Sequence, residues 1–262
     1  MVGDIARLDL RLRRRSTIAY SLGFLAYAVL VVALYPAFEH DAGLEQLTRD
    51  NPTLSALFGA VGSLVSPEGW MNANLYGNFV PLFALLVTIG YGASAIAGQD
   101  EELVLGPIAA MPVSRRKLLA EKCGALLLLS LPIAIVTLAA DLLGPAFDVS
   151  LSGAGLAGAT VGTVLVALDF GLLALAVGAW TGSRGAALGA AVTAAAASYV
   201  ISSLAPVVDA IHPLRFASLV YWSLGDQQLS DGLRPLDAVV LVAAGLVLTV
   251  AAERGFRRLD VH

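Results

Sequence analysis

The sequence predicts an all-α, polytopic membrane protein with six transmembrane helices. Of its 262 residues, 58% are hydrophobic and only 14% are charged, and the apolar residues come in runs rather than in periodic stripes. A helix needs about 20 apolar residues to cross a hydrocarbon core of roughly 30 Å. Six windows near that length carry at most one charge. The whole chain, residues 1–262, is therefore expected to form one transmembrane domain.

The first three spans are predicted from windows without any charged residue. These windows cover residues 16–38, 70–99 and 123–140, the last of them containing Pro132. Extended or trimmed to the length of a membrane crossing, they predict spans at 17–37, 75–97 and 118–140.

The last three spans are predicted from residues 149–183, 185–208 and 238–252. The first of these windows is interrupted only by Asp169, and the second is rich in alanine. The third is short but begins at Pro235 if Asp237 extends its carboxylate towards the interface. The expected spans are 154–180, 186–206 and 235–252.

The distribution of Lys and Arg sets the orientation, because segments that stay in the cytoplasm retain positive charge. With both termini inside, the outer loops 38–74, 141–153 and 207–234 hold only Arg49, Arg215 and Arg234. The cytoplasmic segments hold the other thirteen: Arg7, Arg11, Arg13, Arg14, Arg15, Arg115, Arg116, Lys117, Lys122, Arg184, Arg254, Arg257 and Arg258. The net charge of −4 thus conceals a basic inner face and an acidic outer face, and nucleic-acid binding is not indicated.

Residues 1–16 precede the first span and alternate leucine with arginine. One interpretation is an amphipathic helix at the interface, with its leucines in the acyl boundary and its cations at anionic headgroups. The other is a basic tail that only sets topology. No cleavage site follows, so these residues are not a secretory signal.

The loop at 98–117 carries the only dense charge in the middle of the chain. Its acids are Asp100, Glu101 and Glu102, and its basic half follows Pro112, Val113 and Ser114, beginning at Arg115. Charged side chains at mid-depth in a bilayer cost about 2.5 to 3.5 kcal/mol each, so this loop lies outside the hydrocarbon. Acids in a first turn favour a short helix, and Ser114 suits the N-cap of the third span. The acids then either contact a partner or form a solvated face.

Catalytic, metal and cofactor sites are not predicted in this chain. Cys123 is the only cysteine, and His40, His212 and His262 show no ligand spacing. No phosphate-binding G-x-x-x-x-G-K-[ST] segment occurs, and neither does G-x-S-x-G. If ATP drives this protein, another chain binds it.

Three further features lie in or near the spans. Asp169 must face protein or water, either in an interhelical hydrogen bond, which is favoured, or on a substrate pathway. Small residues at G-x-x-x-G spacing predict close helix packing, within one subunit or at a dimer seam, at Gly158, Gly162, Gly185 and Gly189. Residues 212–222 are apolar but too short to cross, which predicts a re-entrant or interfacial outer helix.

The pattern resembles the permeases of type-2 ATP-binding-cassette (ABC) exporters over the whole chain. The likeness rests on six spans, the basic amino terminus, the long first outer loop, and a loop motif matched by Asp100, Glu101, Pro112, Val113, Ser114, Arg115 and Lys122. Leu103 and Val104 depart from the motif, since Gly-Thr is usual there. Gly106 and Pro107 interrupt a helix that is normally continuous.

The resemblance implies an exporter in a prokaryotic cytoplasmic membrane. The loop would be a coupling helix that enters a cleft of a separate ATPase subunit, with Asp100, Glu101, Glu102, Pro112, Val113, Ser114 and Arg115 at the contact. Two ATPase copies would carry ATP and Mg, and a second permease copy would complete the pair. The alternatives are a secondary transporter with Asp169 as its proton-coupling residue, and a membrane enzyme or scaffold without a transport role.

Overall fold

The computed structural model describes residues 3–41, 43, 46, 64–106, 113–225 and 228–259. Within these ranges every regular element is helical and none is a strand. Six helical units are long and apolar enough to cross a membrane. The predicted all-α, six-span class is confirmed.

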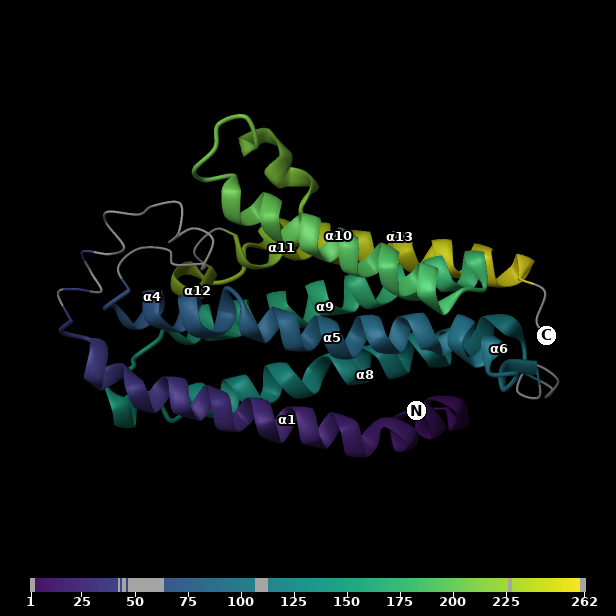
Figure 1. Ribbon diagram of the computed structural model, residues 1–262, viewed down its shortest axis with the longest axis horizontal. Helices are drawn as coiled ribbons and strands as arrows, with labels where there is room; N and C mark the ends of the chain where they lie inside the picture. Colours follow the sequence, from purple (N-terminus) through teal and green to yellow (C-terminus); the bar gives the residue numbers. More distant parts are fainter. Residues whose placement is uncertain are drawn as a thin grey trace.

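The six units run roughly parallel to the long axis of the bundle (Figure 1). They are α1 (Asp4–Phe38), the composite unit Pro67–Glu101, α8 (Arg115–Asp141), α9 (Gly153–Thr181), α10 (Arg184–Leu204) and α13 (Pro235–Arg258). The composite unit consists of α4 (Pro67–Met71), η1 (Asn72–Tyr76), α5 (Phe79–Ala93), η2 (Ser94–Gly98) and α6 (Gln99–Glu101). Short elements connect the later spans: η3 (Gly144–Phe147), η4 (His212–Ala217), α11 (Leu219–Leu224) and α12 (Gln228–Asp231).

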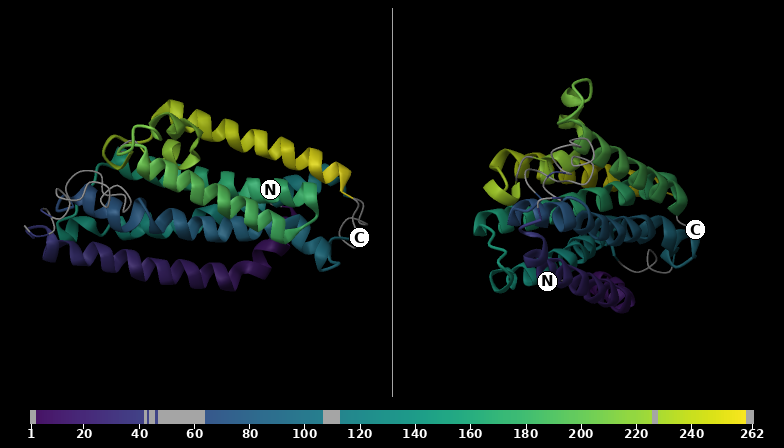
Figure 2. Two further views of the ribbon diagram at one scale, coloured as in Figure 1. Left: turned by 45° about the horizontal axis from the view of Figure 1, so that its top comes forward. Right: turned by 60° about the vertical axis from the view of Figure 1, so that its left-hand side comes forward.

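Helix α1 joins the predicted amino-terminal segment and the first span without a break. No glycine or proline occurs between Asp4 and Leu22, so nothing in the sequence ends a helix at the expected boundary near residue 16. The first turns bend towards the bundle (Figure 2), and Ile5, Ala6 and Asp9 are buried there. This segment is therefore packed against protein on one face.

Three serines begin three of the spans. Ser114, Ser152 and Ser183 each accept a hydrogen bond from the amide of the residue three positions later, at the first turn of α8, α9 and α10. Such N-caps satisfy an amide that the helix itself leaves unpaired. The predicted capping role of Ser114 is confirmed.

Helix α9 is the centre of the bundle and packs against α5, α13, α10 and α8. Its sequence is apolar on every side apart from Asp169, which is the pattern of a helix surrounded by other helices. Helix α1 contacts mainly α8 and lies on the opposite side of the bundle from α10 and α13 (Figure 2).

A close helix crossing joins α5 to α9 and uses Gly92 and Gly171, which the G-x-x-x-G spacing did not select. A Cβ on Gly92 would lie 2.1 Å from the carbonyl oxygen of Gly171. Of the predicted packing glycines, Gly158 instead lies against Gly232 in the loop after α12. Gly158 therefore packs closely against backbone within one subunit, although that backbone belongs to a loop and not to another span.

The other predicted packing glycines differ in their surroundings. Gly162 is buried within α9. Gly185 and Gly189 are exposed, and a Cβ on Gly189 would meet nothing within 4 Å. The expected close packing inside one subunit is therefore absent at Gly189, and the dimer alternative stays a prediction.

Both chain ends and α6 lie towards one end of the bundle, on the right in Figure 1. At this end Glu101 contacts the first residue of α10, and Arg115 contacts the residues that end α13. We call it the charged end, and it comprises the starts of α1, α8 and α10 together with α6 and the end of α13.

At the opposite end, the predicted outer helix at 212–222 is divided in two. Helix η4 ends at Ala217, and Ser218 caps the separate helix α11. The Ser218 hydroxyl also donates to the backbone carbonyl of Ser198 in α10 at 2.7 Å. This contact fixes the chain at Ser218, so one continuous helix does not form.

The crossing of α5 and α9 predicts opposite effects for two neighbouring glycines. Gly92→Ala should lower the melting midpoint in detergent, because the added methyl group meets the Gly171 carbonyl and overpacking costs about 1 to 3 kcal/mol. Gly90→Ala is the control, since nothing lies within 4 Å of its Cβ position and alanine favours a helix. Gel filtration after stepwise heating measures both, and equal shifts would contradict this crossing.

Candidate functional site

A buried ion pair joins α1 to α8 at the charged end. The Nζ atom of Lys122 lies 2.8 Å from Oδ2 of Asp9, and the side chains are 0% and 4% exposed. Lys122 also donates to Oε1 of Gln99 at 2.8 Å. The sequence placed Lys122 among the loop cations that face the cytoplasm. The structure shows that Lys122 is buried rather than exposed, because the second turn of α8 is covered by the amino-terminal turns of α1.

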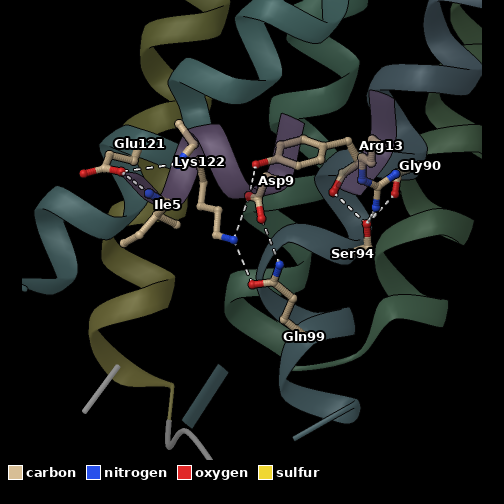
Figure 3. Close-up of polar contacts among 10 residues, drawn as sticks. Ile5, Asp9, Arg13, Gly90, Ser94, Gln99, Glu121 and Lys122 are labelled. Atoms are coloured by element: carbon tan, nitrogen blue, oxygen red, sulfur yellow. Dashed lines mark hydrogen bonds and ion pairs between the residues drawn. The ribbon is translucent and has the colours of Figure 1, made fainter. Parts of the chain in front are cut away.

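Both oxygens of the Asp9 carboxylate accept further hydrogen bonds (Figure 3). The Tyr91 hydroxyl donates to Oδ2 at 2.7 Å, and Nε2 of Gln99 donates to Oδ1 at 3.2 Å. Asp9, Lys122 and Gln99 thus form a closed ring, with Tyr91 on the same carboxylate. We call these four residues the buried network. A buried charge is tolerated when it is paired and its remaining positions are satisfied, and that condition is met here.

The wide turn η2 brings Tyr91 and Gln99 to the same carboxylate. In a regular α-helix, residues eight positions apart are rotated by about 80° from each other. A single π turn takes up one extra residue, so the spacing becomes close to two complete turns. The two side chains therefore point from one face towards Asp9.

Two more contacts fix the first turns of α1. Arg13 donates to the hydroxyl of Ser94, and its guanidinium lies 5.1 Å from the centre of the Tyr91 ring. The Glu121 carboxylate accepts from the backbone amide of Ile5 at 3.0 Å. That carboxylate satisfies a free amide at the positive end of the helix dipole. The start of α1 is thus held by the composite unit and by α8.

The predicted coupling loop, residues 98–117, contains Gln99 of the buried network. Glu101 accepts from the backbone amide of Arg184 at 2.8 Å, at the start of α10. At the far end of the loop, Arg115 donates to the carbonyl oxygens of Phe256 and Leu259, at 2.8 and 2.9 Å. The loop is therefore attached within the chain to α10 on one side and α13 on the other.

The remaining residues predicted at a partner contact differ in exposure. Asp100 is buried, and Val113 is partly buried against the core, while Glu102 is exposed. Pro112 lies outside the described residues. Of the expected coupling helix, the structure describes the short helix α6 and the turn that follows it.

Helix α6 ends in a turn with an unusual residue at its left-handed position. The amide of Val104 donates to the carbonyl of Gln99, and that of Leu103 to Asp100, which is the Schellman pattern. Leu103 has φ +58°, where glycine is normally preferred. Leu103 is one of the two positions at which the sequence departs from the motif that it otherwise resembles. Leu103 and Val104 are 67% and 45% exposed.

Asp169 lies inside α9 and is only 1% exposed, so the prediction that it avoids lipid is confirmed. Within the described part of the chain its Oδ2 atom has no hydrogen-bond partner. The facing residue of α13 is Gly245, where a Cβ would lie 2.8 Å from Oδ1 of Asp169. The interhelical hydrogen bond favoured by the sequence is therefore not formed by Oδ2 within the described residues, and Gly245 offers no side chain for one.

Sequence reasoning missed Asp9, Tyr91 and Gln99. The available signal was a single acid, Asp9, among arginines at one end of the chain, and a lysine at the start of an apolar span. Nothing in the sequence showed that these charges meet 113 positions apart. Among the described residues, no group of three His, Cys, Asp or Glu side chains could hold a metal ion.

The chain was also compared with known proteins. No protein-family model matches it, and no curated protein matches it. The argument for function therefore rests on the geometry of the charged end.

The buried network predicts a large penalty for removing one partner and a recovery when both are removed. Asp9→Asn or Lys122→Met alone should cost about 3 to 5 kcal/mol, because each leaves a buried charge without its counter-ion. The double variant should regain much of that loss. Gel filtration after stepwise heating gives the melting midpoint of each variant for this double-mutant cycle. If the loss of stability in the double variant equalled the sum of the two single losses, the pair would not be coupled.

Proposed function

We propose that this chain is the permease subunit of an ABC exporter, driven by ATP that separate subunits hydrolyse. The observation that carries the proposal is the surface formed by Glu101, Glu102, Leu103 and Val104, which we call the α6 tip. All four residues are exposed, and they combine two carboxylates with two apolar side chains beyond the apolar span. Exposed apolar residues next to charges, outside the hydrocarbon, are typical of a protein contact.

The α6 tip is also built to transmit a displacement. It begins two residues after Gln99, the first residue of α6, and Gln99 contacts both members of the Asp9–Lys122 ion pair. A partner that moved the tip would thus pull on α1 and α8 together, and on α10 through Glu101. A contact that reaches several spans is what coupling to an external ATPase requires.

The rest of the assembly follows from this proposal. Two ATPase subunits would carry ATP and Mg, and a second permease copy would complete the pair across the bilayer. The charged end would face the cytoplasm of a prokaryotic cell, with both termini inside, and the cargo would leave outwards.

Co-purification from membranes of the source organism tests the contact. We expect the wild-type chain to retain a subunit with ATPase activity, and Glu102→Lys with Val104→Ser to lose most of it, because both changes alter exposed side chains of the α6 tip. Asp4→Lys is the control, with the same charge reversal at the same end. Undiminished retention by the tip variant would contradict this site. If no ATPase accompanied the wild-type chain, the exporter assignment would fail.

Leu103→Gly separates stability from function at the tip. Removing the side chain from a left-handed position should stabilise the fold by about 1 kcal/mol. The same change deletes exposed apolar surface, so we expect a higher melting midpoint together with weaker retention of the ATPase subunit. A variant that gained stability and kept its partner would show that the leucine makes no contact.

A secondary transporter remains the second candidate, because Asp169 is buried and its Oδ2 atom has no hydrogen-bond partner in the part of the chain that the structure describes. The chain alone, reconstituted with an internal pH dye, distinguishes the two. We expect no proton uptake down an imposed gradient, and we expect Asp169→Asn to insert and melt like wild type, since Oδ2 of Asp169 has no hydrogen-bond partner among the described residues. Proton uptake by wild type that Asp169→Asn abolished would favour the transporter.

A further inference from the structure

The outward face of α1 carries a basic hollow that the buried network does not use. Arg11, Arg14, Arg15 and Ile18 line this hollow together. Positions three, four and seven apart share one face of an α-helix, so the grouping follows directly from the sequence spacing. Asp9 and Arg13, by contrast, turn inwards to the bundle.

The three guanidinium groups of the hollow have no acidic partner. Within the described ranges, Arg11, Arg14 and Arg15 form no ion pair and no side-chain hydrogen bond, although other arginines at this end do, such as Arg116 with Glu253. All three are exposed. Like charges around one hollow repel each other unless an anion lies between them. The charge pattern therefore calls for an anionic ligand.

The position of the hollow along α1 shows where that anion comes from. The charge-free stretch from Ser16 to Phe38 has 23 residues, which at 1.5 Å per residue gives about 34 Å and covers a hydrocarbon core of roughly 30 Å. The boundary of the hydrocarbon thus falls close to Ser16. Arg14 and Arg15 lie at the headgroup level, and Ile18 lies about one turn deeper.

We propose that this hollow binds the phosphate headgroup of an anionic phospholipid from the leaflet at the charged end. Arginine suits the task, because its planar fork makes two parallel hydrogen bonds to phosphate oxygens. Ile18, which is 45% exposed and lies deeper than the arginines, offers apolar contact to the acyl chains. Free phosphate would use the arginines alone, so the apolar side of the hollow selects a lipid.

The proposal does not depend on the exporter assignment. It would give α1 two anchors on opposite faces, the buried network inside and a lipid outside. A lipid bound there would hold the amino-terminal turns at a fixed depth while the ion pair holds them against the bundle.

Native mass spectrometry of the purified full chain, titrated with phosphatidylglycerol or phosphatidylcholine, tests the site. We expect phosphatidylglycerol to bind at least about tenfold more tightly, and Arg11→Gln/Arg14→Gln/Arg15→Gln to remove that preference. The matched control, Arg7→Gln/Arg116→Gln/Arg254→Gln, has the same change in charge at the same end, outside the hollow, and should keep it. Equal binding of the two lipids, or equal loss in the control, would overturn the proposal.

Two further measurements test whether the site needs guanidinium groups and whether it selects a lipid over free phosphate. Arg11→Lys/Arg14→Lys/Arg15→Lys keeps the charge that sets topology but loses the fork, so an intermediate affinity is expected; wild-type affinity would contradict a guanidinium site. Millimolar inorganic phosphate should not displace phosphatidylglycerol. Full displacement would show that the hollow binds free phosphate and would overturn the choice of a lipid.

Discussion

The ion pair between Asp9 and Lys122 is the constraint on which the charged end of this protein depends. Two charges that are almost completely shielded from solvent must remain together, because separating them would leave an unpaired charge in a poorly polarisable interior. The Asp9 carboxylate also needs further hydrogen-bond donors, and Tyr91 and Gln99 supply them. The positions of α1, α8 and the end of the composite span are therefore set by one requirement.

That requirement explains the wide turn η2. A regular helix would rotate Gln99 away from the carboxylate that Tyr91 already contacts, and the extra residue in the π turn corrects the rotation. The α6 tip begins two residues after Gln99, whose side chain is held by hydrogen bonds to Asp9 and Lys122. The left-handed backbone of Leu103 and its exposed side chain lie on this support.

The centre of the bundle follows a different principle. Helix α9 approaches α5 through Gly92 and Gly171 and approaches α13 through Gly245. In lipid, where apolar burial does not favour protein over solvent, close backbone contact is a main source of helix association. Asp169 is included in this packing although its Oδ2 atom has no hydrogen-bond partner within the described residues. Its burial therefore costs free energy, which the surrounding helix contacts offset.

The sequence by itself determined the all-α class, the six spans and the serine that caps the third of them, because length, hydropathy and capping are local properties of consecutive residues. It also located the charged loop and singled out Asp169 as a residue that avoids lipid. Only the tertiary structure paired Asp9 with Lys122, selected Gly92 over Gly189 for close packing, and attached Glu101 and Arg115 to α10 and α13. These contacts join residues more than 70 positions apart, and which faces of two helices meet depends on all the other helices at once, so no local pattern records it.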